Sequence, residues 1–112
     1  MERYLHASRI RRCWPSAPPE RGLATELLPR GILVNTVAVG VIATSRAVQR
    51  HRREGPELEY SVWAEREAAA REVPLGRLGT AAEVAAAIAF LASPVASYIT
   101  GATLDVAGGL SW

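Results

Sequence analysis

Residues 32–39 form an almost unbroken run of apolar side chains, many of them β-branched (Ile-Leu-Val-Asn-Thr-Val-Ala-Val). A strand with one face in water alternates apolar and polar residues, whereas a parallel strand covered on both faces is continuously apolar. The run therefore predicts a buried parallel strand, and Gly40 after it permits a tight bend. Because parallel strands need a crossover connection, usually through a helix, this feature favours an α/β fold.

A short helix is expected ahead of this strand. Leu23, Leu27 and Leu28 recur at helical spacing. Gly31, which follows Pro29 and Arg30, suits the left-handed residue that ends many helices.

Residues 45–71 are rich in charge and are predicted to be helical in two pieces, broken at Gly55 and Pro56. Arginines precede glutamates along this segment: Arg46, Arg50, Arg52, Arg53, Glu54, Glu57 and Glu59. The basic run at residues 50–53 could bind an anion. The nearby glutamates favour instead a solvent-facing surface whose charges pair with one another.

Residues 74–109 contain a turn, a capped helix, a stop and a strand. Thr80 and Glu83 have the spacing of a capping box, and an apolar stripe follows them until Ser93. Residues 102–106 then form a short predicted strand. Helix, strand, helices and strand in this order indicate an α/β fold. We expect the crossover to the last strand to be right-handed, as nearly all such connections are.

The composition excludes several kinds of chemistry. All 13 basic residues among the 112 are arginine, so mechanisms that need a lysine amine are excluded. Cys13 is the only cysteine, and His6 and His51 are isolated, so no disulfide or metal cluster is expected. The net charge of +2 is too small to argue for nucleic acid or an anionic membrane, so neither partner is expected. No apolar run is long enough to span a bilayer, and we expect a cytoplasmic protein.

The chain is predicted to have two regions. Residues 1–21 show no consistent period and contain three prolines, at positions 15, 18 and 19. We expect this segment to be irregular and disordered. Residues 22–112 carry all the predicted elements and form a partial α/β domain.

Three segments together resemble the C-terminal part of the short-chain dehydrogenases/reductases: ELLPRGILVN at residues 26–35, PLGRLGTAAEVAAAIAFLAS at 74–93 and YITGATLDVAGG at 98–109. The resemblance runs from about Gly22 almost to Trp112. It implies an incomplete Rossmann-like doubly wound parallel sheet, in which residues 32–39 and 102–106 are the last two strands. It also implies an oxidoreductase ancestry in which NAD or NADP exchanges a hydride with a carbonyl or alcohol.

The residues that this family uses for catalysis have no counterpart here. Members hold the pyrophosphate on a Gly-rich loop and use a tyrosine with a lysine four residues on as the acid/base pair. The family spacing places the tyrosine near Arg9 and the lysine near Cys13, and Tyr4 is out of that register. We therefore assign no catalytic residue and expect the chain alone to be inactive.

Part of the family's cofactor site is retained. The family motif Pro-Gly-x-Ile/Val-x-Thr meets the nicotinamide amide, and here Gly40, Ile42 and Thr44 match it while Val39 replaces the proline. The resemblance makes these three the candidate cofactor-binding residues. The alternative is that Thr44 only caps the following helix. Without a pyrophosphate cradle, we expect no tight binding of NAD or NADP by this chain.

The resemblance also implies a subunit interface, formed in family tetramers by the helix between Thr80 and Ser93 and by the last strand. Two strands seldom form an independent sheet, and a free edge on residues 32–39 would invite another chain. The leading hypothesis is a truncated, inactive family member. One alternative is an interaction module that associates with a full-length or complementary subunit. Another is a mis-called start or frameshift, suggested by the change in sequence character near Gly22.

Overall fold

The computed structural model describes residues 3–8 and 19–110. Its centre is a three-stranded sheet formed by β1 (Arg3–Ser8), β2 (Leu33–Val39) and β5 (Thr103–Val106), in the order β1-β2-β5. Both pairs of neighbouring strands are parallel. The α/β fold class and the buried parallel strand predicted at residues 32–39 are therefore confirmed, since β2 is the middle strand.

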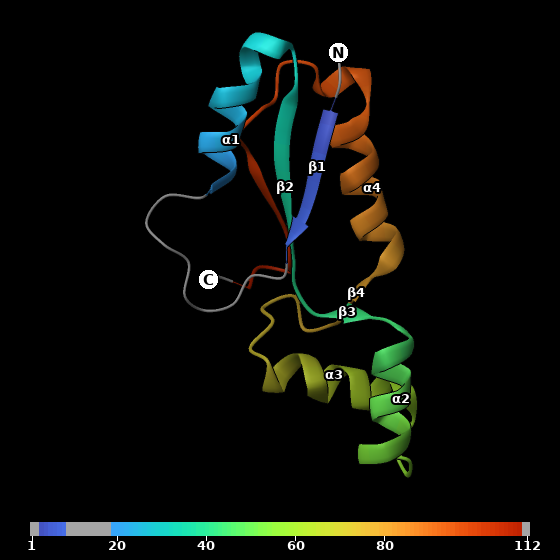
Figure 1. The fold of residues 1–112 in the computed structure, drawn as a ribbon. Coiled ribbons are helices and arrows are strands. Elements are labelled where there is room, and N and C mark those ends of the chain that lie inside the picture. The colour runs from blue at the N-terminus through green and yellow to red at the C-terminus, as the bar shows by residue number, and fades with distance from the viewer. Residues whose placement is uncertain (1–2, 9–18, 111–112) are drawn as a thin grey trace.

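Two helices cover the sheet on opposite faces, as Figure 1 shows. One is α1 (Pro19–Leu27), which continues into a 3-10 turn and ends at Gly31 in the predicted left-handed conformation (φ 71°). The other is α4 (Ala81–Ala92), which has the predicted capping box between Thr80 and Glu83.

The arrangement of these helices corrects one expectation. The strand order continues in one direction from β1 to β5, yet α1 and α4 lie on opposite faces (Figure 1). The two crossovers therefore have opposite hands, and the return to β5 through α4 is left-handed. The usual rule applies to a strand that passes directly through one packed helix. Here the chain first leaves the sheet for two further helices, which frees it to return on the other face.

The N-terminal strand was not expected from the sequence. It pairs with β2 from Arg3 opposite Leu33 to Ser8 opposite Ala38, so β2 has two neighbours rather than one. The free edge lies on β1, not on residues 32–39. Helix α1 begins at Pro19, ahead of the expected boundary at residue 22. Within the segment expected to be disordered, residues 1–2 and 9–18 lie outside the described residues.

A helical pair extends beyond the sheet at the carboxyl ends of its strands (Figure 1). It comprises α2 (Ser45–Glu54) and α3 (Tyr60–Ala70), and the predicted break lies at Gly55. The pair is joined to the sheet through β3 (Ile42–Ala43) and β4 (Gly79–Thr80), which form a two-residue parallel bridge.

The helical pair has its own small core and its own charge network. The buried residues of that core are Trp63, Ala68, Val73 and Leu78. Arg50 pairs with Glu54 of its own helix and with Glu67 of α3, at 3.1 and 2.7 Å. Charges on this segment thus pair with one another, as the closeness of its arginines and glutamates in the sequence predicts.

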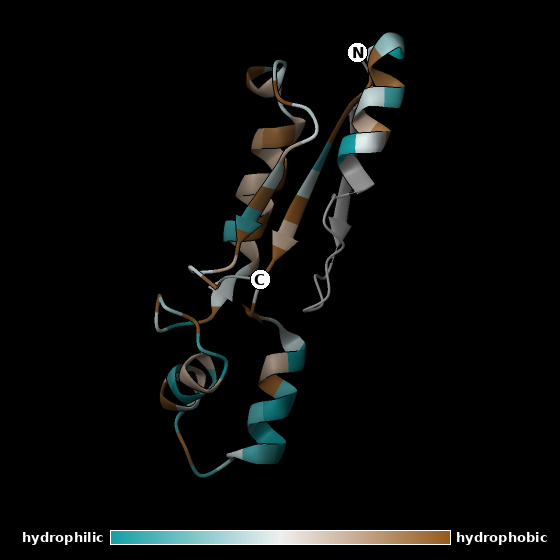
Figure 2. Ribbon diagram, turned by 90° about the vertical axis from the view of Figure 1, so that its left-hand side faces the viewer, coloured by the Kyte–Doolittle hydropathy of each residue, from teal (hydrophilic) through white to brown (hydrophobic). Residues whose placement is uncertain are grey.

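The molecule is elongated, with extents of 56 × 29 × 21 Å and a radius of gyration of 16.6 Å. A compact domain of this length has a radius of gyration of about 13 Å. Figure 2 shows that most residues of α4 are apolar or neutral, while α2 is strongly hydrophilic. A helix that is apolar all round is normally covered by other elements.

Candidate functional site

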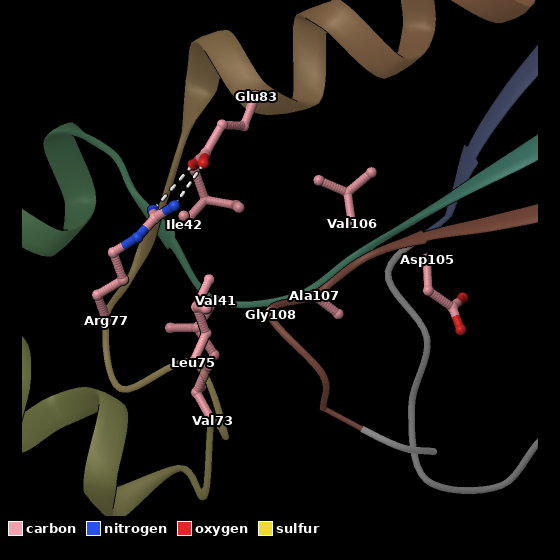
Figure 3. Close-up of a pocket in the computed structure, with 11 residues that line it drawn as sticks. Val41, Ile42, Val73, Leu75, Arg77, Glu83, Asp105, Val106, Ala107 and Gly108 are labelled. Carbon is pink, nitrogen blue, oxygen red and sulfur yellow. Dashed lines mark hydrogen bonds and ion pairs between the residues drawn. The ribbon is translucent and has the colours of Figure 1, made fainter.

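A pocket of ≈ 180 Å³ lies where the carboxyl ends of β2 and β5 meet the bridge between β3 and β4 (Figure 3). In open α/β sheets this end of the strands is where ligands bind. Its lining residues are Val41, Ile42, Val73, Leu75, Arg77, Gly79, Glu83, Asp105, Val106, Ala107 and Gly108. The pocket is mainly apolar, and one ion pair lies on its wall.

Gly40 joins β2 to β5 next to Ala107, which lines this pocket. Its N–H donates to the carbonyl of Val106 at 3.0 Å, which extends the β2–β5 pairing by one step. A Cβ built on Gly40 would lie 2.7 Å from Cα of Ala107. Glycine is therefore required here by close backbone packing, and that packing sets the direction in which the chain leaves β2.

Ile42 lies in β3 and contributes to the pocket wall. Its Cδ1 would be 2.7 Å from a Cβ built on Gly79, so the facing glycine makes room for this side chain. Ile42 pairs with Gly79, and Ala43 pairs with Thr80. The candidate cofactor residue Ile42 is thus held by packing against β4.

Thr44 occupies the N-cap position of α2, with φ −114° and ψ 174°. Its carbonyl accepts a hydrogen bond from the N–H of Val48 at 3.1 Å, but its side chain makes no capping hydrogen bond. Thr44 is exposed and does not line the pocket. The structure thus brings Gly40 and Ile42 to the pocket region and leaves the Thr44 hydroxyl outside it.

The ion pair on the pocket wall joins Arg77 to Glu83, which point toward each other in Figure 3. Arg77 donates through Nη2 to Oε1 at 2.6 Å and through Nη1 to Oε2 at 3.1 Å. Glu83 Oε2 also accepts from the N–H of Thr80 at 2.8 Å. Arg77 and Thr80 lower the pKa of Glu83 to about 2. One carboxylate therefore links the loop after α3 to the start of α4.

Most of the pocket wall was not predicted from the sequence. Val73, Leu75 and Arg77 come from the loop that follows α3, and Ala107 and Gly108 follow β5. The sequence feature that could have predicted this wall is the order of the strands, because segments that follow parallel strands meet at one edge of the sheet.

The described residues fit only one end of a dinucleotide. The Thr44 hydroxyl, which makes no capping hydrogen bond, and the bend at Gly40 could meet a small amide group. The pocket of ≈ 180 Å³ is smaller than the roughly 300 Å³ typical of the smallest ligand sites. In residues 3–8 and 19–110, no Gly-rich loop joins a strand to a helix N-terminus as a pyrophosphate cradle.

The part of the chain that the structure describes holds no group of three or more potential metal ligands. None of its helices has the length and apolar character needed to cross a membrane.

Comparisons with known proteins identify the family. The family described as enoyl-(acyl carrier protein) reductase matches residues 20–111. The chain is 48% identical over 90 residues to 3-oxoacyl-acyl-carrier-protein reductase FabG of Pseudomonas aeruginosa. It is 46% identical over 89 residues to galactitol 2-dehydrogenase (L-tagatose-forming) of Cereibacter sphaeroides. Each match covers 80% of this chain but 32% of the relative, so the chain spans about a third of their length.

Solved structures agree with the sequence relatives. The apo structure of a short chain oxidoreductase from Pseudomonas aeruginosa PAO1, described as containing an atypical catalytic centre, superposes with a TM-score of 0.78 at 41% identity. That match covers 83% of this chain and 36% of the other. The NADPH-bound structure of a short chain oxidoreductase from the same strain, described in the same way, gives a TM-score of 0.73 at 38% identity. The chain therefore belongs to the short-chain dehydrogenase/reductase family.

Proposed function

We propose that this chain is a partial oxidoreductase unit that provides the nicotinamide end of a cofactor site and does not catalyse hydride transfer alone. The proposal rests on one observation: residues 20–111 match the family, yet the sequence contains no lysine. The family's proton transfer depends on a tyrosine whose pKa a lysine lowers. The family spacing places the tyrosine near Arg9 and the lysine near Cys13, so neither member of the pair is present in register.

The local geometry supports a residual nicotinamide contact. Gly40 fixes the exit from β2 through its packing on Ala107, and Thr44 presents a hydroxyl that is not used for capping. Such a hydroxyl can both donate and accept a hydrogen bond, which suits a carboxamide. Residues 3–8 and 19–110 offer no Gly-rich cradle for the two phosphates, so most of the binding free energy of a dinucleotide would be missing.

The experiment is a fluorescence titration of the purified chain with NADPH and with NADH, combined with a turnover assay on carbonyl substrates. We expect dissociation constants weaker than about 1 mM and no turnover. Replacing the Thr44 hydroxyl by Thr44→Val should remove what weak binding there is, while Thr25→Val on α1 should leave it unchanged. Micromolar binding of NADPH or NADH, or measurable turnover, by the chain without substitutions would refute the proposal.

For an enzyme that combines this chain with the rest of the family fold, the proposed substrate class is a carbonyl or an alcohol. The relatives at 46% and 48% identity are named for galactitol and for a 3-oxoacyl-acyl-carrier-protein. Nearly equal identity to such different enzymes means that the matched region does not discriminate between their substrates. The cytoplasmic location stays a prediction.

A second candidate function is association with family subunits through α4 and β5. Within Ala81–Ala92 only Leu91 is buried, although most of this helix is alanine or larger apolar residues. Phe90 is 45% exposed, and Leu104 on β5 is 37% exposed. Uncovered apolar surface of this kind often marks a protein interface.

Co-expression with full-length FabG of Pseudomonas aeruginosa, followed by capture of the tagged chain, tests this second function. We expect FabG to be retained and Phe90→Asp to release it. Val62→Asp, on the exposed face of α3, is the matched control because Val62 is 39% exposed and lies away from α4. Failure to retain FabG, or equal loss with both variants, would contradict the interface.

A further inference from the structure

The outer edge of β1 is a complete strand edge with no partner in the part of the chain that the structure describes. Strand β1 is the end strand in the order β1-β2-β5, and all of Arg3–Ser8 pairs with β2 on its inner side. Alternate residues of a paired strand direct their N–H and C=O groups away from the neighbour. The outer side of β1 therefore presents a row of backbone donors and acceptors.

The sequence of this edge strand carries few of the features that prevent pairing. Protected edge strands are short, bulged, or carry proline or charged residues, lysine in particular; in β1 the residue of this kind is Arg3. Strand β1 is six residues long and has the sequence RYLHAS, which contains no proline and no lysine. The opposite edge, on β5, is four residues long. Of the two edges, β1 offers the longer template.

The fold also favours the direction of an added strand. Helices cover both faces of the sheet, and sheets covered in this way are almost always parallel throughout. A second copy of this chain related by a two-fold axis would place its own β1 antiparallel to the first. A parallel strand from a different polypeptide fits the sheet better than a symmetric copy does.

The comparisons indicate which polypeptide carries such a strand. The unit described here superposes on a solved relative with a TM-score of 0.78, and it covers 36% of that chain. In the relative, the remaining part of the chain belongs to the same folded protein. An elongated unit with an unpaired parallel edge is the shape expected of one part of a larger sheet.

We propose that the outer edge of β1 accepts a parallel strand from a polypeptide that supplies the rest of a short-chain dehydrogenase/reductase sheet. This inference rests on the second candidate function, association with family subunits, and assigns a different surface to it. The edge on β1 and the surface of β5 lie at opposite ends of the strand order, so contacts at the two can be measured separately.

The test uses the full chain and the part of Pseudomonas aeruginosa FabG that lies outside the region matched here, co-expressed and purified through a tag on one partner. Hydrogen exchange is measured by mass spectrometry for the chain alone and for the complex. We expect the amides of residues 3–8 to exchange at least about tenfold more slowly in the complex. Amides of residues 103–106 should be unchanged.

A variant series and a second partner complete the design. Leu5→Pro and His6→Pro alter adjacent residues, so one of them removes an amide on the outer edge. That variant should lose the complex, whereas Leu5→Ala should retain it. Full-length FabG, which contains its own copy of the region matched here, should leave exchange at residues 3–8 unchanged even if it binds through α4.

Three results would overturn the proposal: no complex with the partial FabG, a complex whose protection lies on residues 81–92 or 103–106, or a homodimer of this chain joined through residues 3–8. The first result combined with retained full-length FabG would leave the second candidate function standing. Loss of both complexes would remove that function as well.

Discussion

Gly40 packs directly on Ala107, so closely that a Cβ on Gly40 would lie 2.7 Å from the Ala107 Cα and 2.9 Å from its Cβ. This contact fixes the exit of the chain from β2 against the end of β5. It places the bend that carries Ile42 and Thr44.

Gly40→Ala should therefore destabilise the fold, because one of two backbone segments must move. Overpacking of this kind costs about 1–3 kcal/mol, measured as the change in the free energy of unfolding in urea. Gly22→Ala is the control, since a Cβ at Gly22 meets nothing within 4 Å and the residue lies in α1. That substitution should raise stability by about 0.5–1 kcal/mol. Equal changes in the free energy of unfolding for Gly40→Ala and Gly22→Ala would show that the contact with Ala107 does not restrict position 40.

Thr80 and Thr44 both occupy N-cap positions, but only Thr80 makes a capping hydrogen bond. Its Oγ1 accepts from the N–H of Glu83 at 3.2 Å. Thr80→Ala should lower the free energy of unfolding by about 1 kcal/mol. Thr44→Ala should change it by less than about 0.5 kcal/mol. A large effect at Thr44 would mean that its hydroxyl has a structural role that the geometry does not show.

The sequence was most informative where local chemistry decides the structure. The β-branched run predicted β2, the Thr80–Glu83 spacing predicted the capping box of α4, and Gly31 ended the first helical segment. Each of these features depends on residues within a few positions of one another. Their physical causes can therefore be read without knowing the rest of the fold.

Features that depend on distant pairing were not predicted. Strand β1 has no apolar period of its own and forms by pairing with β2 about thirty positions along the chain. Arg77 and Glu83 are six positions apart and meet across a turn and a strand bridge, so no periodic pattern within one element brings them together. The hand of the return to β5 depends on the whole excursion through α2 and α3. In each case tertiary packing, rather than local preference, decides the outcome.

The lowered pKa of Glu83 predicts loss of stability in acid. Its pKa in the folded state is about 2, below the ordinary glutamate value of 4.5, because Arg77 and Thr80 favour the carboxylate. Such a group stabilises the fold fully above its unfolded pKa, and the contribution is lost as pH falls from 4.5 toward 2. The free energy of unfolding should fall across this range. Glu83→Gln and Arg77→Gln should each flatten that part of the profile, and an unchanged slope in both would contradict the assignment.

Asn35 provides the sharpest test of how β2 is tied to the segment before β5. Its side chain is buried, with 3% exposure. The Nδ2 group donates to the carbonyl of Ile99 at 2.9 Å, and Oδ1 accepts from the N–H of Ala102 at 3.1 Å. Asn35→Asp keeps the shape but sets a carboxylate oxygen against the Ile99 carbonyl. At neutral pH the variant should lose about 3 kcal/mol, since a buried donor has been replaced by an unpaired charge.

The pH dependence distinguishes this cause from simple loss of packing. Repulsion by the Ile99 carbonyl and burial both raise the pKa of an Asp at position 35 in the folded state. The protonated form can donate to Ile99, so the loss should be smallest below the unfolded pKa of about 3.9 and should grow as pH rises through the folded value. Asn35→Ala has no ionisable group and should lose stability equally at both ends of this range. If Asn35→Asp showed the same flat profile, the bridge from Asn35 to Ile99 would not hold these segments together.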